Sequence, residues 1–299
     1  MLHNNDKIFI FVINGGAGKN VMATAVVNAY KKNNPDRKII VLTAWKAIWM
    51  FNPNVYRTYQ YGNISNFYID LIKDRNKNDI DICAIEPYNS TDYILKNKHL
   101  IEIWCDLCGV NYNGEMPELF FNQREIEFTI NKYNLGKAPY MVIQTNGGAQ
   151  QDTKFSWMRD MPMNIANDVV NEFSKTHRII QIRRDDQLLL PNVESFVGNL
   201  REMMVLIRYS DKRLFIDSVS QHIACALDKK STVLWVRNSP DILGYKMHNN
   251  IITHIEDEID VLQESVLEPY DIAGNIYQCP FKEGTVLFDA EEVIASLKN

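Results

Sequence analysis

The chain has 299 residues, of which 46% are hydrophobic and 23% are charged, so it is long enough to fold as two ordinary globular domains. No apolar run approaches the roughly 20 residues of a membrane span, and the first residues lack the basic and then apolar pattern of a signal peptide. We therefore expect a cytoplasmic protein. The formal net charge of −5 argues against nucleic-acid binding by bulk electrostatics, although a local basic groove is compatible with it.

Five cysteines, an odd number, argue against a disulfide framework, and we expect Cys105 and Cys108 in the core.

The first 43 residues predict a strand, a helix and a second strand. Residues 7–13 form a continuous apolar run that ends in Asn14-Gly15-Gly16, which is typical of a strand buried on both faces of a parallel sheet. Residues 21–32 have helical character and residues 38–43 form the next strand, so the segment predicts a βαβ unit with a right-handed crossover. Further along we expect helices over 66–75, 100–108 and 123–133, and strands over 80–85 and 118–121.

The same pattern restarts after a boundary at residues 134–139. A strand over 140–144 runs into a second Asn-Gly-Gly turn at 146–148, and strands follow over 178–182 and 214–216. The two turns form a weak internal repeat, which predicts two similar α/β domains. We also expect helices over 164–175, 200–209 and 289–298.

The glycine-rich turn between Asn14 and Asn20 matches neither of two common phosphate-binding motifs. A P-loop needs Gly at the position of Ile13 and Ser or Thr at that of Asn20, and a dinucleotide fingerprint needs a third glycine at the position of Val21. The turn still lies at the carboxyl end of a strand, a preferred ligand position in α/β sheets. We expect Gly16 and Gly18 near a ligand, because glycine lets the backbone come close. A tight turn with no ligand is the alternative.

The stretch after residue 213 predicts an anion site. The strand over 214–216 stops at Asp217 and Ser218, and a helix follows with Gln221 and His222 in its first turns. Free N–H groups and the helix dipole favour negative charge at such a helix N-terminus. Capping of the helix by Ser218 is the competing interpretation.

Two further turns of the second half are candidate ligand positions. Arg183 and Arg184 follow the strand over 178–182 and could hold a diphosphate in bidentate fashion. A solvated cluster in which they pair with Asp185 and Asp186 is equally compatible with the sequence. A plain turn is likewise the alternative at Asn146.

Two of these segments together resemble glycosyltransferase family 9, the lipopolysaccharide heptosyltransferase family. The first is Gly15-Gly-Ala-Gly-Lys-Asn-Val-Met-Ala-Thr-Ala-Val26, followed by Lys31-Lys-Asn-Asn-Pro-Asp36, and the second is Asp217-Ser-Val-Ser-Gln-His-Ile-Ala-Cys-Ala-Leu227. The resemblance is specific mainly over residues 13–36 and 213–244. One departure matters: Lys19 stands at the position of the aspartate that is the proposed catalytic base of the family.

The resemblance implies a GT-B fold, in which two Rossmann-like α/β/α domains face each other across a cleft. Residues 1–137 would bind the acceptor and residues 138–275 the nucleotide-sugar donor, and residues 276–299 would contain a helix that packs back on the first domain. In the family the loop matching Asn146, Gly147 and Gly148 approaches the donor diphosphate. Asp217, Ser218, Gln221, His222, Arg183 and Arg184 would then lie on the donor side.

The implied activity is metal-independent, inverting transfer of a sugar from a nucleotide sugar to a hydroxyl acceptor, with a cell-surface saccharide as the expected acceptor. No cofactor or metal is expected, and peripheral membrane association is compatible with such an acceptor. One alternative is a phage-type transferase that glycosylates a modified base in DNA. Another is a sugar-nucleotide-binding module that has lost catalysis.

Lys19 cannot simply replace an aspartate as a general base, because an unperturbed lysine is protonated at neutral pH. We expect it to be cationic and to contact donor phosphate or an anionic acceptor. The base would then be a carboxylate elsewhere in the N-terminal domain. A solvated lysine at the start of a helix is the alternative, although the helix dipole disfavours a cation there.

Overall fold

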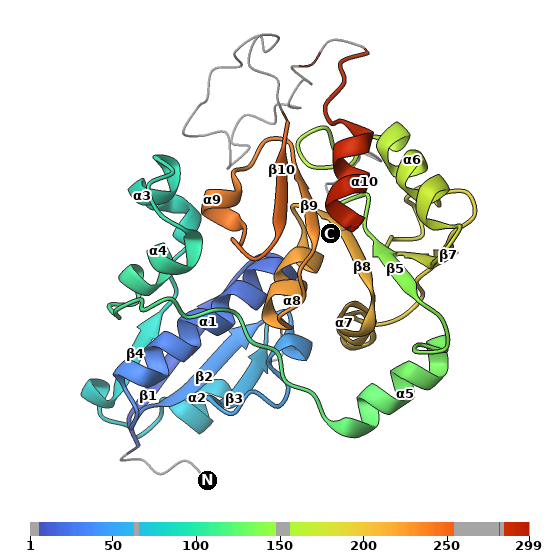
Figure 1. Ribbon diagram of the computed structural model, residues 1–299. Coiled ribbons are helices and arrows are strands. Elements are labelled where there is room, and N and C mark those ends of the chain that lie inside the picture. Colours follow the sequence, from blue (N-terminus) through green and yellow to red (C-terminus); the bar gives the residue numbers. More distant parts are fainter. Residues whose placement is uncertain (1–5, 63–65, 148–155, 254–280, 282–283, 299) are drawn as a thin grey trace. The chain divides into compact units, whose positions relative to one another are not determined.

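A computed structural model describes residues 6–62, 66–147, 156–253, 281 and 284–298 (Figure 1). It divides into two compact units. The first unit comprises residues 1–137, 197–209 and 218–229, and the second comprises residues 138–196, 210–217 and 230–299. Each unit has its own parallel sheet, as the restart of the pattern predicts.

The sheet of the first unit has four strands in the order β3-β2-β1-β4. They are β1 (Ile8–Ile13), β2 (Lys38–Thr43), β3 (Val55–Gln60) and β4 (Ile80–Cys83). Every pair is parallel, and Ile8 lies opposite Lys38 of β2 and Ile80 of β4. β1 is an inner strand with nearly every residue buried, which explains its continuous apolar sequence.

The helices of this unit begin with α1 (Ala17–Asn33), whose alanine-rich middle is buried. Helix α1 packs against α4 and α8, and α5 packs against α7. The expected strand over 118–121 is absent, and the helix expected over 66–75 is limited to α2. The remaining elements are η1 (Lys46–Trp49), α2 (Phe67–Leu71), η2 (Lys77–Asp79), η3 (Pro87–Asn89), α3 (Thr91–Ile94), α4 (Leu100–Leu107), α5 (Gln123–Tyr133), α7 (Leu200–Tyr209) and α8 (Val219–Ala226).

The sheet of the second unit has six parallel strands in the order β7-β6-β5-β8-β9-β10. They are β5 (Tyr140–Ile143), β6 (Arg178–Gln181), β7 (Glu194–Ser195), β8 (Lys212–Ile216), β9 (Thr232–Trp235) and β10 (Asn249–Ile252). If the strands of this unit are numbered from 1 to 6 along the chain, their order in the sheet is 3-2-1-4-5-6, which is the Rossmann order. The order reverses between β5 and β8, and in the first sheet it reverses in the same way between β1 and β4. Ligands of open α/β sheets bind at such switch points, outside the carboxyl ends of the strands.

Two features of the structure differ from the expected domain boundaries. Helices α7 and α8 group with the first unit, although they lie within the predicted second domain. The C-terminal helix α10 (Ala290–Lys298) packs on α6 (Met163–Phe173) and on β8 and β9 of the second unit, not on the first domain. The reason is its apolar face, since Val293 and Leu297 are buried in the core of the second unit. Lys298 Nζ also pairs with Glu172 on α6 at 2.7 Å.

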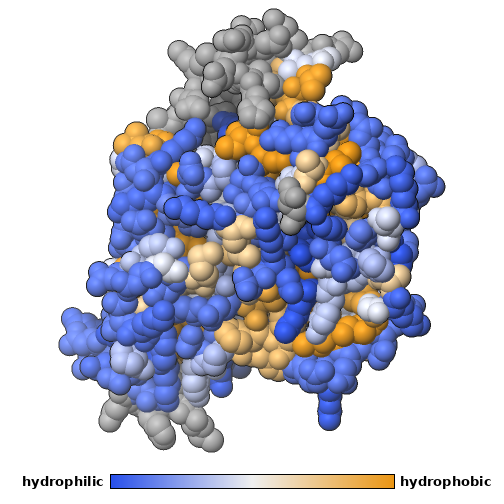
Figure 2. All heavy atoms as spheres, viewed as in Figure 1, coloured by the Kyte–Doolittle hydropathy of each residue, from blue (hydrophilic) through white to orange (hydrophobic). Residues whose placement is uncertain are grey.

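Hydrophilic side chains cover most of the face shown in Figure 2, with hydrophobic areas between them. Among the residues that the structure describes, no helix is both long enough and apolar enough to cross a membrane. The short helix α9 (Pro240–Leu243) completes the second unit.

Candidate functional site

The switch point of the first sheet brings together the turn after β1 and the segment after β4. Gly15 has a φ of +90°, which a residue with a side chain adopts only with strain, and its carbonyl accepts a hydrogen bond from Trp45 Nε1 at 2.9 Å. Lys19 lies in the first turn of α1, and Glu86 lies just before η3. Because β1 and β4 are neighbours, these two side chains meet at the same edge of the sheet.

Lys19 is buried and paired, so it is not the solvated lysine of the alternative interpretation. Its side chain is 5% exposed and its Nζ forms an ion pair and hydrogen bond with Oε1 of Glu86. The ammonium also lies 5.1 Å from the ring centroid of Tyr88 and 5.2 Å from that of Trp104. Burial lowers the pKa of Lys19, and the Glu86 carboxylate raises it. The anion beside Lys19 in this structure is therefore a carboxylate of the same chain.

Asn20 holds the turn in place and is a residue that the sequence did not reveal. It is fully buried, and its Oδ1 accepts hydrogen bonds from Thr43 Oγ1 at 2.5 Å and Trp49 Nε1 at 3.2 Å. Its Nδ2 donates to the carbonyl of Gly16 at 3.1 Å. These bonds fix the start of α1 against the carboxyl end of β2. The only signal in the sequence is one asparagine at the start of an otherwise apolar helical segment.

Gly18 has a packing role. A Cβ atom there would lie 2.8 Å from Cδ2 of His222 and 3.5 Å from Cα of Val219, so glycine permits α1 and α8 to approach each other. His222 and Gln221 are buried on α8, with Gln221 Nε2 3.2 Å from His222 Nδ1. Ser218 occupies the N-cap position, but its side chain makes no capping hydrogen bond. All three residues group with the first unit, and not with the donor-side unit in which they were expected.

The turn after β5 in the second unit is held by a buried carboxylate. Asp160 is 4% exposed and accepts hydrogen bonds from Asn146 Nδ2 at 2.9 Å, Gly147 N at 2.8 Å and Ser156 N at 2.8 Å. Gln187 Nε2 donates to the Gly147 carbonyl at 2.9 Å. This bond joins the turn after β5 to the loop after β6. Gly148 lies outside the described residues.

Arg159 lies between two predicted site residues at the switch point of the second sheet. A Cβ atom on Gly147 would collide with the Arg159 side chain, which explains the glycine. Asp217, at the carboxyl end of β8, is buried next to Asn238, whose Nδ2 donates to Oδ2. Burial raises the pKa of Asp217, while the hydrogen bond from Asn238 and the charge of Arg159 oppose that rise. Arg159 thus brings a cation to the carboxyl ends of β5 and β8.

The two arginines expected to bind phosphate are engaged in local contacts. Arg183 Nη1 donates to the carbonyls of Arg184 at 2.6 Å and Gln187 at 2.7 Å, so it organises its own loop. Arg184 donates to both carboxylate oxygens of Asp186, from Nε at 3.1 Å and from Nη2 at 3.0 Å. Arg184 therefore forms the pairing with an aspartate that the sequence allowed as an alternative to phosphate binding.

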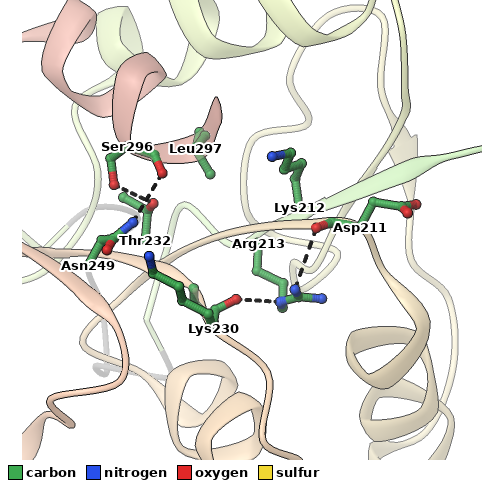
Figure 3. A pocket seen from close by; sticks show the side chains of 9 residues that line it. Asp211, Lys212, Arg213, Lys230, Thr232, Asn249, Ser296 and Leu297 are labelled. Carbon is green, nitrogen blue, oxygen red and sulfur yellow. Dashed lines mark hydrogen bonds between the residues drawn. The ribbon is translucent and has the colours of Figure 1, made fainter. Parts of the chain in front are cut away.

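A pocket of about 100 Å³ lies at the opposite edge of the second sheet, where β8, β9 and β10 begin (Figure 3). Its polar groups mostly bond to one another: Thr232 Oγ1 lies 2.8 Å from Ser296 Oγ, and Arg213 Nε donates to the Lys230 carbonyl at 2.7 Å. Asn249 Nδ2 donates to the Ser296 carbonyl at 3.1 Å. These contacts fix the end of α10 against the sheet. Elsewhere in the described part of the chain, no cluster of three or more His, Cys, Asp or Glu side chains is arranged to hold a metal ion.

No protein-family model and no curated protein matches this sequence. Solved structures do match it. A family 9 glycosyl transferase from Veillonella parvula has a TM-score of 0.67 and 11% identity, and the match covers 98% of this chain and 96% of that one. The ADP-heptose LPS heptosyltransferase II of E. coli has a TM-score of 0.59 and 13% identity, over 88% of this chain and 97% of that one. The heptosyltransferase WaaC of E. coli, solved with ADP, has a TM-score of 0.55 and 13% identity, over 82% and 93%.

The fold is GT-B. Two Rossmann-like domains are what the resemblance to family 9 predicted, so the fold class is confirmed. In this GT-B chain the predicted turn residues Asn146, Gly147 and Asp217 share one switch point with Arg159, and the other switch point carries Lys19 and Glu86. Neither Arg159 nor Glu86 stands out in the sequence.

Proposed function

We propose that this protein is a glycosyltransferase that moves a sugar from a nucleotide sugar to a hydroxyl acceptor. The observation that carries the proposal is the switch point of the second sheet, where the Gly147 turn, Arg159 and Asp217 lie together in a GT-B fold. A glycine turn and a cation at the carboxyl ends of parallel strands suit a diphosphate group.

The donor diphosphate is assigned to this group of residues. Sugar transfer requires that the nucleoside diphosphate leave with the electron pair of the bond to the anomeric carbon. A cation that is already in place stabilises the charge that develops on the leaving oxygen. Arg159 is that cation in our proposal, in place of a metal ion. The Asp160 carboxylate contributes by holding Asn146 and Gly147 in position.

The reaction is proposed to invert the anomeric centre, with the acceptor hydroxyl attacking the face opposite the leaving group. A cell-surface saccharide is the proposed acceptor, bound by the first unit. Two alternatives make different predictions. A DNA-modifying transferase requires affinity for DNA that falls steeply with salt. An inactive binding module requires nucleotide-sugar binding without turnover.

The proposal is tested with a panel of ADP-, GDP- and UDP-linked sugars. We expect at least one to raise the melting temperature, because a ligand that binds only the folded state stabilises it. The same donor should release its nucleoside diphosphate faster when saccharide acceptors are added, and a chelator should not change the rate. NMR of the product reports the anomeric configuration. Binding without release would support the inactive module, and no binding by any donor would contradict the proposal.

A further inference from the structure

We propose that Glu86 is the general base of the transfer reaction and that Lys19 positions it. The inference rests on the proposed function and names the residue that would activate the acceptor hydroxyl. Neither role was assigned by the sequence, in which Lys19 stands where a carboxylate was expected and Glu86 lies in a segment without a motif.

The topology places Glu86 where a ligand of the first sheet is expected. The strand order reverses between β1 and β4, and the switch point therefore lies between the segments that follow these strands. Glu86 follows β4, and the glycine turn with Lys19 follows β1. Asp81 is the second residue of β4, near the amino-terminal end of that strand, and it pairs with Arg37 at 2.9 Å. Of these two carboxylates, only Glu86 lies at the carboxyl-terminal edge of the sheet, where a ligand is expected.

The contacts of Glu86 suit a base. Its side chain is 32% exposed, whereas that of Lys19 is 5% exposed, so the carboxylate is the member of the pair that an acceptor can reach. Oε1 contacts Lys19, and no described residue forms a hydrogen bond or ion pair with Oε2. Oε2 is thus the oxygen that would take the proton.

Lys19 fits a positioning role better than a catalytic one. It is surrounded by the rings of Tyr88 and Trp104 and is nearly inaccessible. Its ammonium holds Oε1 of Glu86 through an ion pair and hydrogen bond, which fixes the orientation of the carboxylate. Tyr88 of η3 and Trp104 of α4 lie close to the Lys19 ammonium, and His222 of α8 lies against Gly18, the residue before Lys19 on α1.

The step balances without any further reactant. The acceptor oxygen forms a bond to the anomeric carbon while its proton passes to Oε2 of Glu86. The bond between the anomeric carbon and the phosphate oxygen breaks, and the nucleoside diphosphate leaves with the electron pair. Glu86 then returns the proton to solvent. Water can take the place of the acceptor hydroxyl, so donor hydrolysis reports the same base.

The first test replaces the carboxylate. Release of nucleoside diphosphate from ADP-, GDP- and UDP-linked sugars is measured for wild type, Glu86→Gln and Asp81→Asn. Glu86→Gln should slow release about 10²- to 10⁴-fold, the usual contribution of a general base, with unchanged affinity for the nucleoside diphosphate. Asp81→Asn is the matched control, since it removes the ion pair of Asp81 with Arg37 on the strand that precedes Glu86. This variant should retain the wild-type rate.

The second test examines how Lys19 holds Glu86. Lys19→Met removes the contact to Oε1 of Glu86, so kcat for nucleoside diphosphate release should fall while the affinity for the nucleoside diphosphate stays at the wild-type value, and Lys19→Arg, which keeps a cationic donor beside Oε1, should recover part of the rate. A purely structural lysine would lower the stability of the protein without lowering kcat. If Glu86→Gln proves unstable because it leaves Lys19 buried without a counter-charge, the double variant Lys19→Met/Glu86→Gln removes both charges and should fold but remain inactive.

The outcomes separate this inference from the proposed function. Release by wild type together with an unimpaired Glu86→Gln, or an unimpaired double variant, would overturn the role of Glu86 alone. An unchanged kcat in Lys19→Met would overturn the role of Lys19. If wild type neither binds nor cleaves any of these donors, the proposed function fails first.

Discussion

At the scale of single residues, the second unit uses one buried carboxylate and one arginine to build its turn. Asp160 takes three hydrogen bonds that would otherwise leave buried donors unpaired, and such a network specifies a single conformation of the turn. Arg159 then lies against Gly147 and within electrostatic range of Asp217. Arg159 therefore lies beside the turn after β5, and both are at the carboxyl-terminal edge of the second sheet.

Replacing Arg159 should weaken donor binding. We expect Arg159→Ala to lower the affinity for nucleoside diphosphates by about 10- to 150-fold, since a charge-assisted hydrogen bond contributes about 1.5–3 kcal/mol. Isothermal titration with ADP, GDP and UDP measures the change. Arg178→Ala is the control: Arg178 is paired with Glu194 at the amino end of β6 and should have no effect. Equal affinity of Arg159→Ala and wild type would remove Arg159 from the donor site.

The sequence placed those candidate residues that are tied to strand ends. Asn146 and Gly147 lie in the turn after β5 and Asp217 directly follows β8, and parallel strands bring their carboxyl ends to one edge. Arg159 and Glu86 could not be predicted, because their positions depend on how chain segments without regular periodicity return to the sheet. For Arg183 and Arg184 the sequence left two interpretations open. In this structure Arg183 contacts loop carbonyls and Arg184 pairs with Asp186.

At the scale of elements, Cys83 of β4 and Cys108 at the end of α4 form a contact that no sequence motif indicated. Their Sγ atoms are 2.7 Å apart, whereas Cys105, the other member of the C-x-x-C, is fully buried. The hydrogen bond from Cys108 lowers the pKa of Cys83, and burial raises the pKa of Cys105 to about 12. Of these thiols Cys83 is the one whose pKa is lowered, and its thiolate population increases with pH.

An azodicarboxamide oxidant should convert Cys83 and Cys108 to a disulfide. The thiols lose two protons and two electrons, and the oxidant is reduced to the hydrazine. Mass spectrometry of non-reduced peptides should show the cross-link, and it should form faster at higher pH because the attacking species is a thiolate. Cys105→Ser should leave the cross-link intact, and Cys108→Ser should abolish it. A cross-link that persists in Cys108→Ser would show that the two thiols are not partners.

The C-terminal helix α10 was predicted as an element, and it was expected to pack on the first domain, whereas it packs on α6, β8 and β9 of the second unit. Its apolar spacing marks a buried face without saying which core receives that face. In the structure Leu297 and Val293 lie in the same core as Leu214 of β8 and Leu234 of β9. Polar contacts accompany this packing, among them Lys298 with Glu172, Ser296 with Thr232, and the Ser296 carbonyl with Asn249.

Truncating Leu297 should destabilise the second unit. Leu297→Ala removes a side chain that is 4% exposed, and such changes cost about 2–5 kcal/mol. Hydrogen exchange should then be faster in α6, β8 and β9, which contact α10. Glu291→Ala, at an exposed position of the same helix, should change stability by less than about 0.5 kcal/mol. Faster exchange confined to other elements would contradict the packing described.

At the scale of the whole molecule, both units begin with the same strand order, 3-2-1-4, and each places its candidate residues at the reversal of that order. The sequence predicted this duplication, because each half opens with an apolar strand that runs into an Asn-Gly-Gly turn. It could not predict that α7 and α8 group with the first unit. That grouping depends on contacts such as Gly18 with His222, between residues about two hundred positions apart in the chain.

The distribution of charge over the first unit bears on the nature of the acceptor. A DNA acceptor requires basic side chains that are free to neutralise phosphates. Many lysines and arginines of this unit instead pair with carboxylates of the same unit. These pairs are Lys32–Glu115, Arg37–Asp81, Lys38–Asp6, Arg57–Asp70, Lys98–Asp106, Lys132–Glu202 and Arg201–Glu125. Together with a net charge of −5, this pairing favours a neutral saccharide over a polyanion.

We therefore predict that double-stranded DNA does not bind at physiological salt. Fluorescence anisotropy with a labelled duplex should show no saturable binding up to about 100 µM protein, the weak end of the range for non-specific DNA binding. Lowering the salt concentration should change little, because the net charge is negative and many basic side chains of the first unit are paired with carboxylates. The opposite result is equally informative. Binding that weakens steeply between about 50 and 200 mM salt would mean that several phosphates are neutralised, and a modified base in DNA would then replace the saccharide as the proposed acceptor.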